Sequence, residues 1–281
     1  MSIMFMKVRS LSRAKGDSAV AKAAYISRDK LRDQRTGVRH DYRRTAGLQH
    51  SQILVPSDAS PEIRAWGDDR SRLWNAAESA ERQRNSRVGR EYTVSLPHEL
   101  SAQARHAVAV EFAQRISDRY GVAVDLAIHG PTAKGDPRNH HIHVLASTRE
   151  ITAGGFGAKS TMELNTDRRR EIGLPHVAAE YRNLRQMWAS LANDRLREAG
   201  IAERLEPRSK RTIARDTAAE LNLAADSENG LHPEAENPLE TTRKRAVERW
   251  LAYKANGPMQ DTGARDKTLD RSRHLDAGLD L

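Results

Sequence analysis

The sequence predicts an α+β domain of two layers, with helices packed on one face of an antiparallel sheet. Two segments, 122–130 (VAVDLAIHG) and 140–147 (HHIHVLAS), alternate with the period of two that is typical of strands. A connection of about ten residues joins them, which suits an antiparallel pair with a long loop. One face of the pair is apolar, and two long amphipathic segments, 101–121 and 175–200, are available to cover it.

Two strands and a helix are expected in the first sixty residues. Asp17 or Ser18 is suited to cap an Ala-rich helix that carries Tyr25. The strands are the segments 3–10 (IMFMKVRS) and 52–56 (QILVP).

A helix and a strand then lead to the first long helix. The amphipathic pattern predicts the helix around 70–85, and 90–97 (REYTVSLP) alternates as a strand with Glu91 on its polar face. Gly121 and Gly200 are placed to end the two long helices.

Composition limits the classes of function. The chain has 281 residues, 47 Lys and Arg against 38 Asp and Glu, and a formal net charge of +9, which suits a polyanion such as nucleic acid. The absence of cysteine excludes disulfides, thiolate zinc sites and cysteine nucleophiles. No apolar run is long enough for a membrane span or a signal peptide, so a cytoplasmic protein is the simplest expectation.

The sequence becomes polar and only weakly periodic after about residue 206. We expect one domain over 1–206, followed by a polar extension over 207–281 that holds one helix near 239–257 and a disordered tail.

Four of the 11 histidines fall between residues 129 and 143. By strand parity His141 and His143 share a face, and pairing with the preceding strand brings His129 to the same face. Three neutral imidazoles can hold a divalent metal and leave positions open for a substrate oxygen, although surface or structural histidines give the same pattern. Asp125 and Glu91 lie on compatible faces and are candidates to orient the rings.

A metal beside a basic surface suggests a phosphodiester substrate, either hydrolysed by water or attacked by a side-chain hydroxyl. Tyr25 is the candidate nucleophile because the alanines around it leave its surroundings uncrowded, and the product of its attack is a covalent phosphotyrosine. The alternative is a tyrosine that packs in the core.

Several segments, in order, resemble the MobA/MobL family of conjugative relaxases within the HUH endonucleases. They span roughly residues 1 to 200 and are SRAKGDSAVAKAAYISRDKL, LWNAAESAERQRNSRVGREYTVSLPHEL, VDLAIHG, NHHIHVLASTRE, GGFGAKS and LRQMWASLANDRL. The resemblance implies the HUH-type fold, an antiparallel sheet with the histidines on its central strands.

The resemblance also implies roles for individual residues. Tyr25 matches the nucleophile and His129, His141 and His143 match the metal triad. Glu91 matches an acidic residue near the site, as a base for the tyrosine or as a partner of a ligand. The expected metal is Mg²⁺ or Mn²⁺.

The chain departs from the family pattern at two places. His140 stands where the family usually has proline, and by parity it points away from the metal unless the strand is shifted by one residue. After residue 200 the segment ERLEPRSKR echoes the family only loosely, and we expect no helicase or primase extension.

The implied activity is a relaxase that nicks one strand at the transfer origin of a plasmid or mobile element. Tyr25 would keep the 5′ phosphate and release a 3′-OH. The resemblance implies a monomer that works with relaxosome accessory proteins and a type IV coupling protein, and that enters the recipient cell attached to DNA.

Basic side chains are expected to carry the single strand, although each is equally explained as a solvated surface charge. Lys159 is favoured because nearby glycines let a phosphate approach the backbone. The full set is Arg9, Arg13, Lys15, Arg149, Lys159, Arg168, Arg169 and Arg170.

Two other classes of function remain open from the sequence. A metal-dependent phosphoester hydrolase would use water and form no covalent adduct. A DNA-binding repressor or accessory protein would keep the fold and charge without breaking a strand.

Overall fold

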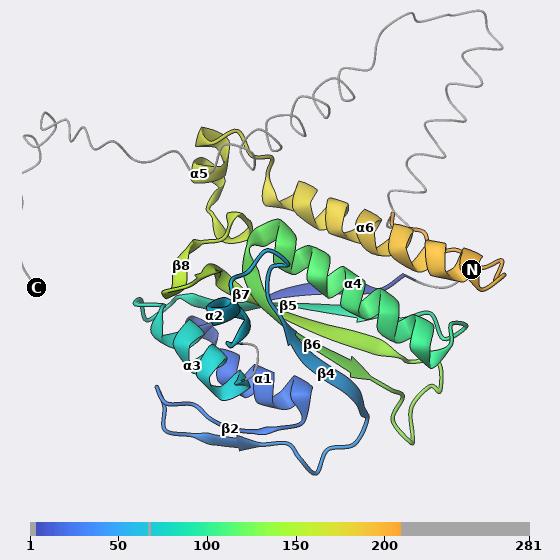
Figure 1. Ribbon diagram of the computed structural model, residues 1–281, viewed down its shortest axis with the longest axis horizontal. Helices are drawn as coiled ribbons and strands as arrows, with labels where there is room; N and C mark the ends of the chain where they lie inside the picture. The colour runs from blue at the N-terminus through green and yellow to red at the C-terminus, as the bar shows by residue number, and fades with distance from the viewer. Residues whose placement is uncertain (1–3, 67–68, 209–281) are drawn as a thin grey trace, which may run out of the picture. The chain divides into compact units, whose positions relative to one another are not determined.

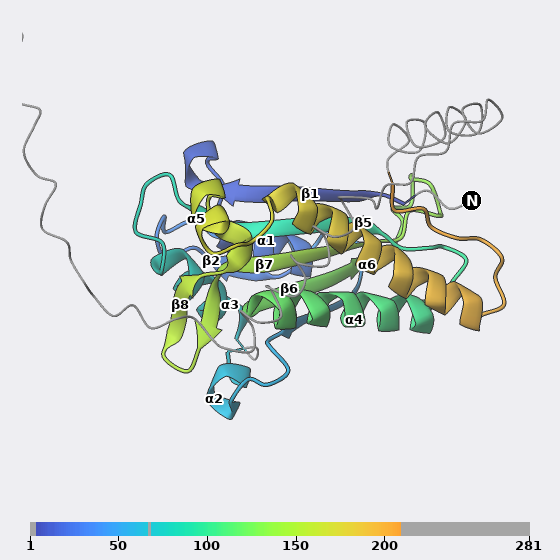
Figure 2. The same ribbon diagram turned by 90° about the horizontal axis from the view of Figure 1, so that it is seen from above.

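The main sheet is antiparallel, and its strands lie in the order β1-β5-β7-β6-β4, with β8 pairing onto the end of β7 (Figures 1 and 2). The computed structural model describes residues 4–66 and 69–208. The strands are β1 (Met6–Ser12), β4 (Leu48–Leu54), β5 (Arg87–Ser95), β6 (Val122–His129), β7 (His141–Thr152) and β8 (Gly155–Lys159).

One face of the sheet packs against two long helices, α4 (Ala102–Tyr120) and α6 (Val177–Glu198) (Figure 2). Every second residue of β6, and of β7 as far as Ala146, contributes to this core, and Phe112 of α4 meets Trp188 of α6 with ring centroids 5.1 Å apart. Gly121 adopts the left-handed conformation that ends α4, with φ of 64°. The predicted antiparallel sheet with helices packed on it is confirmed.

The other face carries a further helical layer over the central strands. It is formed by α1 (Ala19–Ser27) and α3 (Arg70–Ser79), which pack through small sheet residues such as Ala123 and Ala127. Since β6 is buried along its whole length, both of its faces are covered. The two-layer prediction therefore holds for the α4 and α6 side, and the structure adds α1 and α3 on the side of the histidines.

The first helix is the expected Ala-rich helix that carries Tyr25, and it is nine residues long. Ser18 is the N-cap, and its side chain accepts a hydrogen bond from the Ala21 amide. The helix ends at Ser27 because Arg28 takes the left-handed conformation, and the chain then forms a hairpin of β2 (Lys30–Arg32) and β3 (Arg39–Asp41) that the sequence pattern did not indicate.

Short helices complete the described part of the chain: α2 (Pro61–Arg64), α5 (Thr166–Glu171), and 3₁₀ turns at Arg13–Lys15 and Thr161–Glu163. Within residues 4–66 and 69–208, none of the helices has the length and apolarity that a membrane crossing requires. The expected helix near 239–257 and the expected tail lie outside the described residues, so the division at residue 206 stays a prediction.

Candidate metal and nucleophile site

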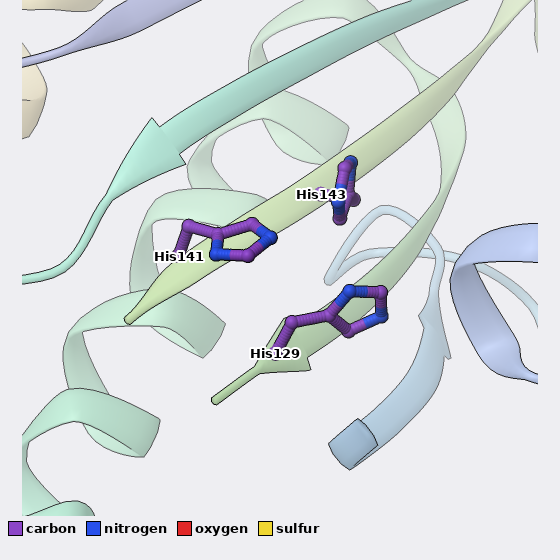
Figure 3. Close-up of side chains that lie close together, drawn as sticks. All are labelled: His129, His141 and His143. Carbon is purple, nitrogen blue, oxygen red and sulfur yellow. The ribbon is translucent and has the colours of Figure 1, made fainter. Parts of the chain in front are cut away.

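Three imidazoles meet at one end of the two central strands (Figure 3). His129 is the last residue of β6 and lies directly opposite His141, the first residue of β7, while His143 lies opposite Ala127. One ring nitrogen from each histidine can be chosen so that all three lie within 4.8 Å of one another. The pairing register thus produces the cluster that strand parity predicted.

Each ring is oriented by a hydrogen bond from one of its nitrogens to an oxygen. His129 Nε2 lies 2.7 Å from the Ile26 carbonyl, and His141 Nδ1 lies 3.2 Å from the Asn139 carbonyl. His143 Nδ1 lies 2.7 Å from Glu91 Oε1. Because oxygen acceptors require a hydrogen on these nitrogens, the lone pair of each ring is on its other nitrogen and available to a metal.

The surroundings favour the neutral rings that bind metals. Burial lowers the pKa of His129 to about 4, against the opposing effect of the hydrogen bond to the Ile26 carbonyl. Burial also lowers the pKa of His141. At neutral pH both rings are uncharged and need lose no proton to bind a cation, so the donor set fits a divalent metal.

Glu91 is buried and uses a different oxygen for each of its two partners. Oε1 accepts from His143, and Oε2 lies 3.1 Å from Lys22 Nζ on α1. Burial acts to raise the pKa of Glu91, but the His143 hydrogen bond and the Lys22 charge outweigh it and lower the pKa to about 2. A carboxylate with so low a pKa is a weak base, so its contacts fit a partner of the ligand rather than a base for the tyrosine.

Tyr25 lies beside this cluster and is exposed. Its ring centroid is 6.3 Å from that of His143 and 5.4 Å from that of Tyr42, with 38 % of the residue accessible to solvent. Ala23 and Ala24 on the same helix are fully buried, which lets α1 approach the sheet closely. The sequence left open whether Tyr25 is a nucleophile or a residue of the core. Its exposed ring beside the histidines disfavours the core.

Two cations flank the Tyr25 ring, one on α1 and one at the residue that ends it, and the sequence pattern singled out neither. Lys22 Nζ lies 5.2 Å from the ring centroid and the Arg28 guanidinium carbon lies 4.6 Å from it. Arg28 Nη2 also lies 3.5 Å from His129 Nδ1. The spacing of three residues between Lys22 and Tyr25 is the available signal, since such residues share a helix face, whereas Arg28 lies beyond the end of the helix and gives no such signal.

Asp125 does not orient the histidines as expected. Its carboxylate is fully buried and accepts hydrogen bonds from Arg70 Nε at 2.8 Å and from Trp74 Nε1 at 3.0 Å. Both of these bonds go to Oδ2, and Arg70 Nη2 donates to Oδ1 at 3.1 Å. Asp125 shares a face with His129, but the side chains of α3 occupy both of its oxygens. Its role is to hold α3 on the sheet.

His140 lies outside the cluster. Ile142 is fully buried in the core under α4 and α6, so β7 keeps the predicted register and turns His141 and His143 to the site. The His140 carbonyl accepts a hydrogen bond from the Leu96 amide at 2.8 Å.

Two of the basic residues expected to bind DNA are structural. Arg13 donates to the buried carboxylate of Glu78 at 2.8 Å, and its side chain is only 10 % exposed. Arg169 is 2 % exposed and donates to the Pro175 carbonyl at 2.7 Å and to the Thr161 carbonyl. Both guanidiniums bond to groups of the protein interior, which contradicts the expected contact with DNA.

Lys159 and Arg149 bind one carboxylate far from the histidines. Lys159 Nζ lies 2.6 Å and Arg149 Nε 2.8 Å from Glu81 Oε1. Arg149 is six residues beyond His143 on the same strand, a separation of about 20 Å. The glycines that favoured Lys159 as a phosphate contact instead belong to the β7–β8 hairpin that carries it.

The other expected DNA contacts are exposed. Arg9 pairs with Asp17, Arg168 with Glu171 and Arg170 with Asp167, and Lys15 lies in the 3₁₀ turn after β1. Only Arg9 lies close to the site, because β1 pairs it with Glu91.

The comparisons with known proteins agree with this arrangement. The MobA/MobL family model matches residues 17–229. The mobilization protein MobL of Acidithiobacillus ferridurans is 30 % identical, over 92 % of this chain and 72 % of that protein. The conjugal transfer protein TraA of Agrobacterium fabrum is 28 % identical over 88 % of this chain, which spans only 24 % of that protein. A solved structure reported as the molecular basis of vancomycin resistance transfer in Staphylococcus aureus has a TM-score of 0.59 and 27 % identity, covering 74 % of this chain and 100 % of that one. The chain belongs to the MobA/MobL family.

Proposed function

We propose that the protein is a DNA relaxase that nicks one strand at the transfer origin of a plasmid or mobile element. The observation that carries this proposal is an exposed tyrosine next to three convergent imidazoles, with Tyr25 and His143 centroids 6.3 Å apart. Membership of a family whose relatives are named for mobilization and conjugal transfer supports it.

His129, His141 and His143 would hold the divalent metal, which when bound neutralises charge on the scissile phosphate. Of the two metals expected from the sequence, Mn²⁺ fits better. Mg²⁺ takes oxygen ligands and releases water reluctantly, whereas imidazole nitrogen suits the transition metals.

The covalent step belongs to Tyr25. Its phenol oxygen forms a bond to phosphorus as the bond from phosphorus to the 3′ oxygen breaks, leaving a 5′-phosphotyrosine and a 3′-OH. The phenol proton passes to solvent at the exposed ring, and the departing 3′ oxygen gains a proton. Since the number of phosphodiester bonds is unchanged, the reverse reaction rejoins the strand.

The charge of the site favours an anionic substrate. Lys22 and Arg28 both lie by the Tyr25 ring and stabilise the phenolate that must form. Within the described residues, Glu91 is the carboxylate that bonds to a triad ring, and it is shared with Lys22. A divalent metal would therefore leave a positive excess, which a phosphodiester and a phenolate together offset.

The DNA strand would approach over β1. Lys7 of β1 lies beside Thr93 of β5, and Thr93 lies beside His143 of β7, because each of these residues pairs with the next across the sheet. Lys7 and Arg9 are exposed on this side, and Phe5 just before β1 is 51 % exposed. An exposed aromatic ring beside alternating cations suits stacking of a base and contact with the backbone phosphates. Arg9 thus remains a DNA-binding candidate.

The wider function follows from the same proposal. The protein would act as a monomer on one strand, together with accessory proteins and a coupling protein, and would travel to the recipient cell on the 5′ end. The described residues contain no contact that identifies these partners, so they rest on the family alone.

The test uses single-stranded oligonucleotides from the element's own candidate origins, labelled at the 3′ or 5′ end. With Mn²⁺ we expect the fragment on the 3′ side of the nick to shift onto protein in a denaturing gel, with no shift in EDTA or for Tyr25→Phe. Cleavage without an adduct would instead identify a phosphoester hydrolase. Binding without cleavage across all candidate origins would identify an accessory protein.

A further inference from the structure

Arg28 has a backbone conformation that its side chain does not favour. Its φ of 54° is the only positive value at a residue other than glycine within residues 4–66 and 69–208. The left-handed conformation brings Cβ of an L residue too close to the backbone, and glycine avoids that clash. An arginine kept at such a position suggests a function for the guanidinium.

The guanidinium is held between the tyrosine and the metal-binding rings. Nη1 donates to the Tyr25 carbonyl at 2.7 Å, the guanidinium carbon lies 4.6 Å from the Tyr25 ring centroid, and Nη2 lies 3.5 Å from His129 Nδ1. His129 Nδ1 carries the lone pair left for a metal, since Nε2 donates to the Ile26 carbonyl. Arg28 thus faces the atom that a metal would take.

Arg28 has a positive charge and, within residues 4–66 and 69–208, no carboxylate partner. The ion pairs of the described residues include Lys22 with Glu91 and Arg70 with Asp125, and none of them involves Arg28. Its Nε is buried and makes no hydrogen bond. A half-buried guanidinium that lies beside the nucleophile and is in none of these ion pairs is placed to receive an anion.

We propose that Arg28 binds a non-bridging oxygen of the phosphate that Tyr25 attacks, and that it gives up its contact with His129 when that ring binds a metal. This rests on the proposed nicking function. The phosphate would then lie between two positive charges, the metal on the imidazoles and the guanidinium beside the phenol. In the absence of DNA the metal ion and the guanidinium would repel each other, so Arg28 weakens metal binding.

The proposal gives Arg28→Gly two effects of opposite direction. Glycine suits the left-handed position, so the thermal midpoint should be kept or raised. Removal of a phosphate-binding cation should slow single-turnover adduct formation about 10²- to 10³-fold. Removal of a charge near the metal should tighten Mn²⁺ binding without DNA about three- to tenfold, measured by calorimetry.

Two further variants serve as controls. Arg28→Lys keeps the charge and should recover a large part of the cleavage rate while leaving Mn²⁺ affinity near that of the wild type. Arg82→Gly removes the same charge from an exposed site next to Glu81, far from the histidines, and should change neither value.

An Arg28→Gly protein with wild-type cleavage, or with unchanged or weaker Mn²⁺ binding, would overturn the proposal. If the wild type forms no adduct on any origin, the nicking function fails instead. The Mn²⁺ titration then still reports whether Arg28 opposes the metal.

Discussion

Replacement of Glu91 by glutamine tests how the metal ligands are oriented. Glu91 satisfies two donors with two oxygens, His143 Nδ1 at 2.7 Å and Lys22 Nζ at 3.1 Å, and it is 5 % exposed. Glutamine has one acceptor oxygen, and its amide nitrogen cannot accept a hydrogen bond. The Glu91→Gln side chain therefore satisfies one donor and opposes the other.

The size of the effect follows from the hydrogen bond that changes. A bond to a charged group contributes about 1.5–3 kcal/mol and a neutral one about 0.5–1.5 kcal/mol. The middles of these ranges differ by about 1.25 kcal/mol, which is roughly eightfold in an equilibrium constant. We expect Mn²⁺ affinity to fall about tenfold, and up to about 100-fold if the His143 ring also loses its orientation.

The assay combines an Mn²⁺ titration with single-turnover cleavage at increasing Mn²⁺. If Glu91 orients His143, saturating Mn²⁺ should restore cleavage to within about threefold of the wild type, because the group lost acts through metal occupancy. Glu111→Gln on α4, outside the site, is the matched control. Unchanged Mn²⁺ affinity with a saturated rate lowered about 10²-fold or more would refute this reasoning and make Glu91 the general base.

Four further outcomes are expected. Arg70→Met leaves the buried carboxylate of Asp125 without its cation, and should cost about 3–5 kcal/mol of unfolding free energy in urea while Mn²⁺ affinity is unchanged. Glu81→Gln should destabilise the fold at pH 7. Burial acts to raise the pKa of Glu81, but the hydrogen bonds and the charge of Lys159 outweigh burial and lower the pKa. The stability that the Glu81 carboxylate gives is therefore present above its unfolded pKa, and it is lost as the pH falls through the lower folded pKa. Melting temperatures of the two proteins should therefore converge in acid. Cleavage should be faster with Mn²⁺ than with Mg²⁺ at equal concentration. Phe5→Ala and Lys7→Ala should each weaken binding of a labelled single strand, the first by about 1–3 kcal/mol in a titration of fluorescence anisotropy.

The sheet and its histidines were predictable because strand alternation is a local property. Once β6 and β7 pair, the period of two decides which residues share a face, so His129, His141 and His143 lie on one face in any register that keeps the apolar residues buried. The pairing of His129 with His141 then brings the three rings together. The same parity correctly kept Ile142 in the core and His140 out of the cluster.

The contacts that were missed or wrong depend on which element covers which strand. Asp125 has the parity of a partner for His129, and only the packing of α3 decides that Arg70 and Trp74 take it. The prediction that Arg13 and Arg169 bind DNA was wrong for the same reason. Arg13 and Arg169 read as surface charges, and nothing in the local pattern reveals the buried Glu78 or the interior carbonyls that bind them.

The end of α1 couples the nucleophile to the metal ligands. One turn of chain supplies the Tyr25 ring, the Ile26 carbonyl that orients His129, and the Arg28 guanidinium that faces the same ring. One turn earlier, Lys22 bonds to the carboxylate that orients His143. A shift of this helix would move the tyrosine and disturb two of the three rings together. The fully buried Ala23 and Ala24, which set how closely α1 lies on the sheet, therefore control the geometry of the site although neither contacts a ring nitrogen.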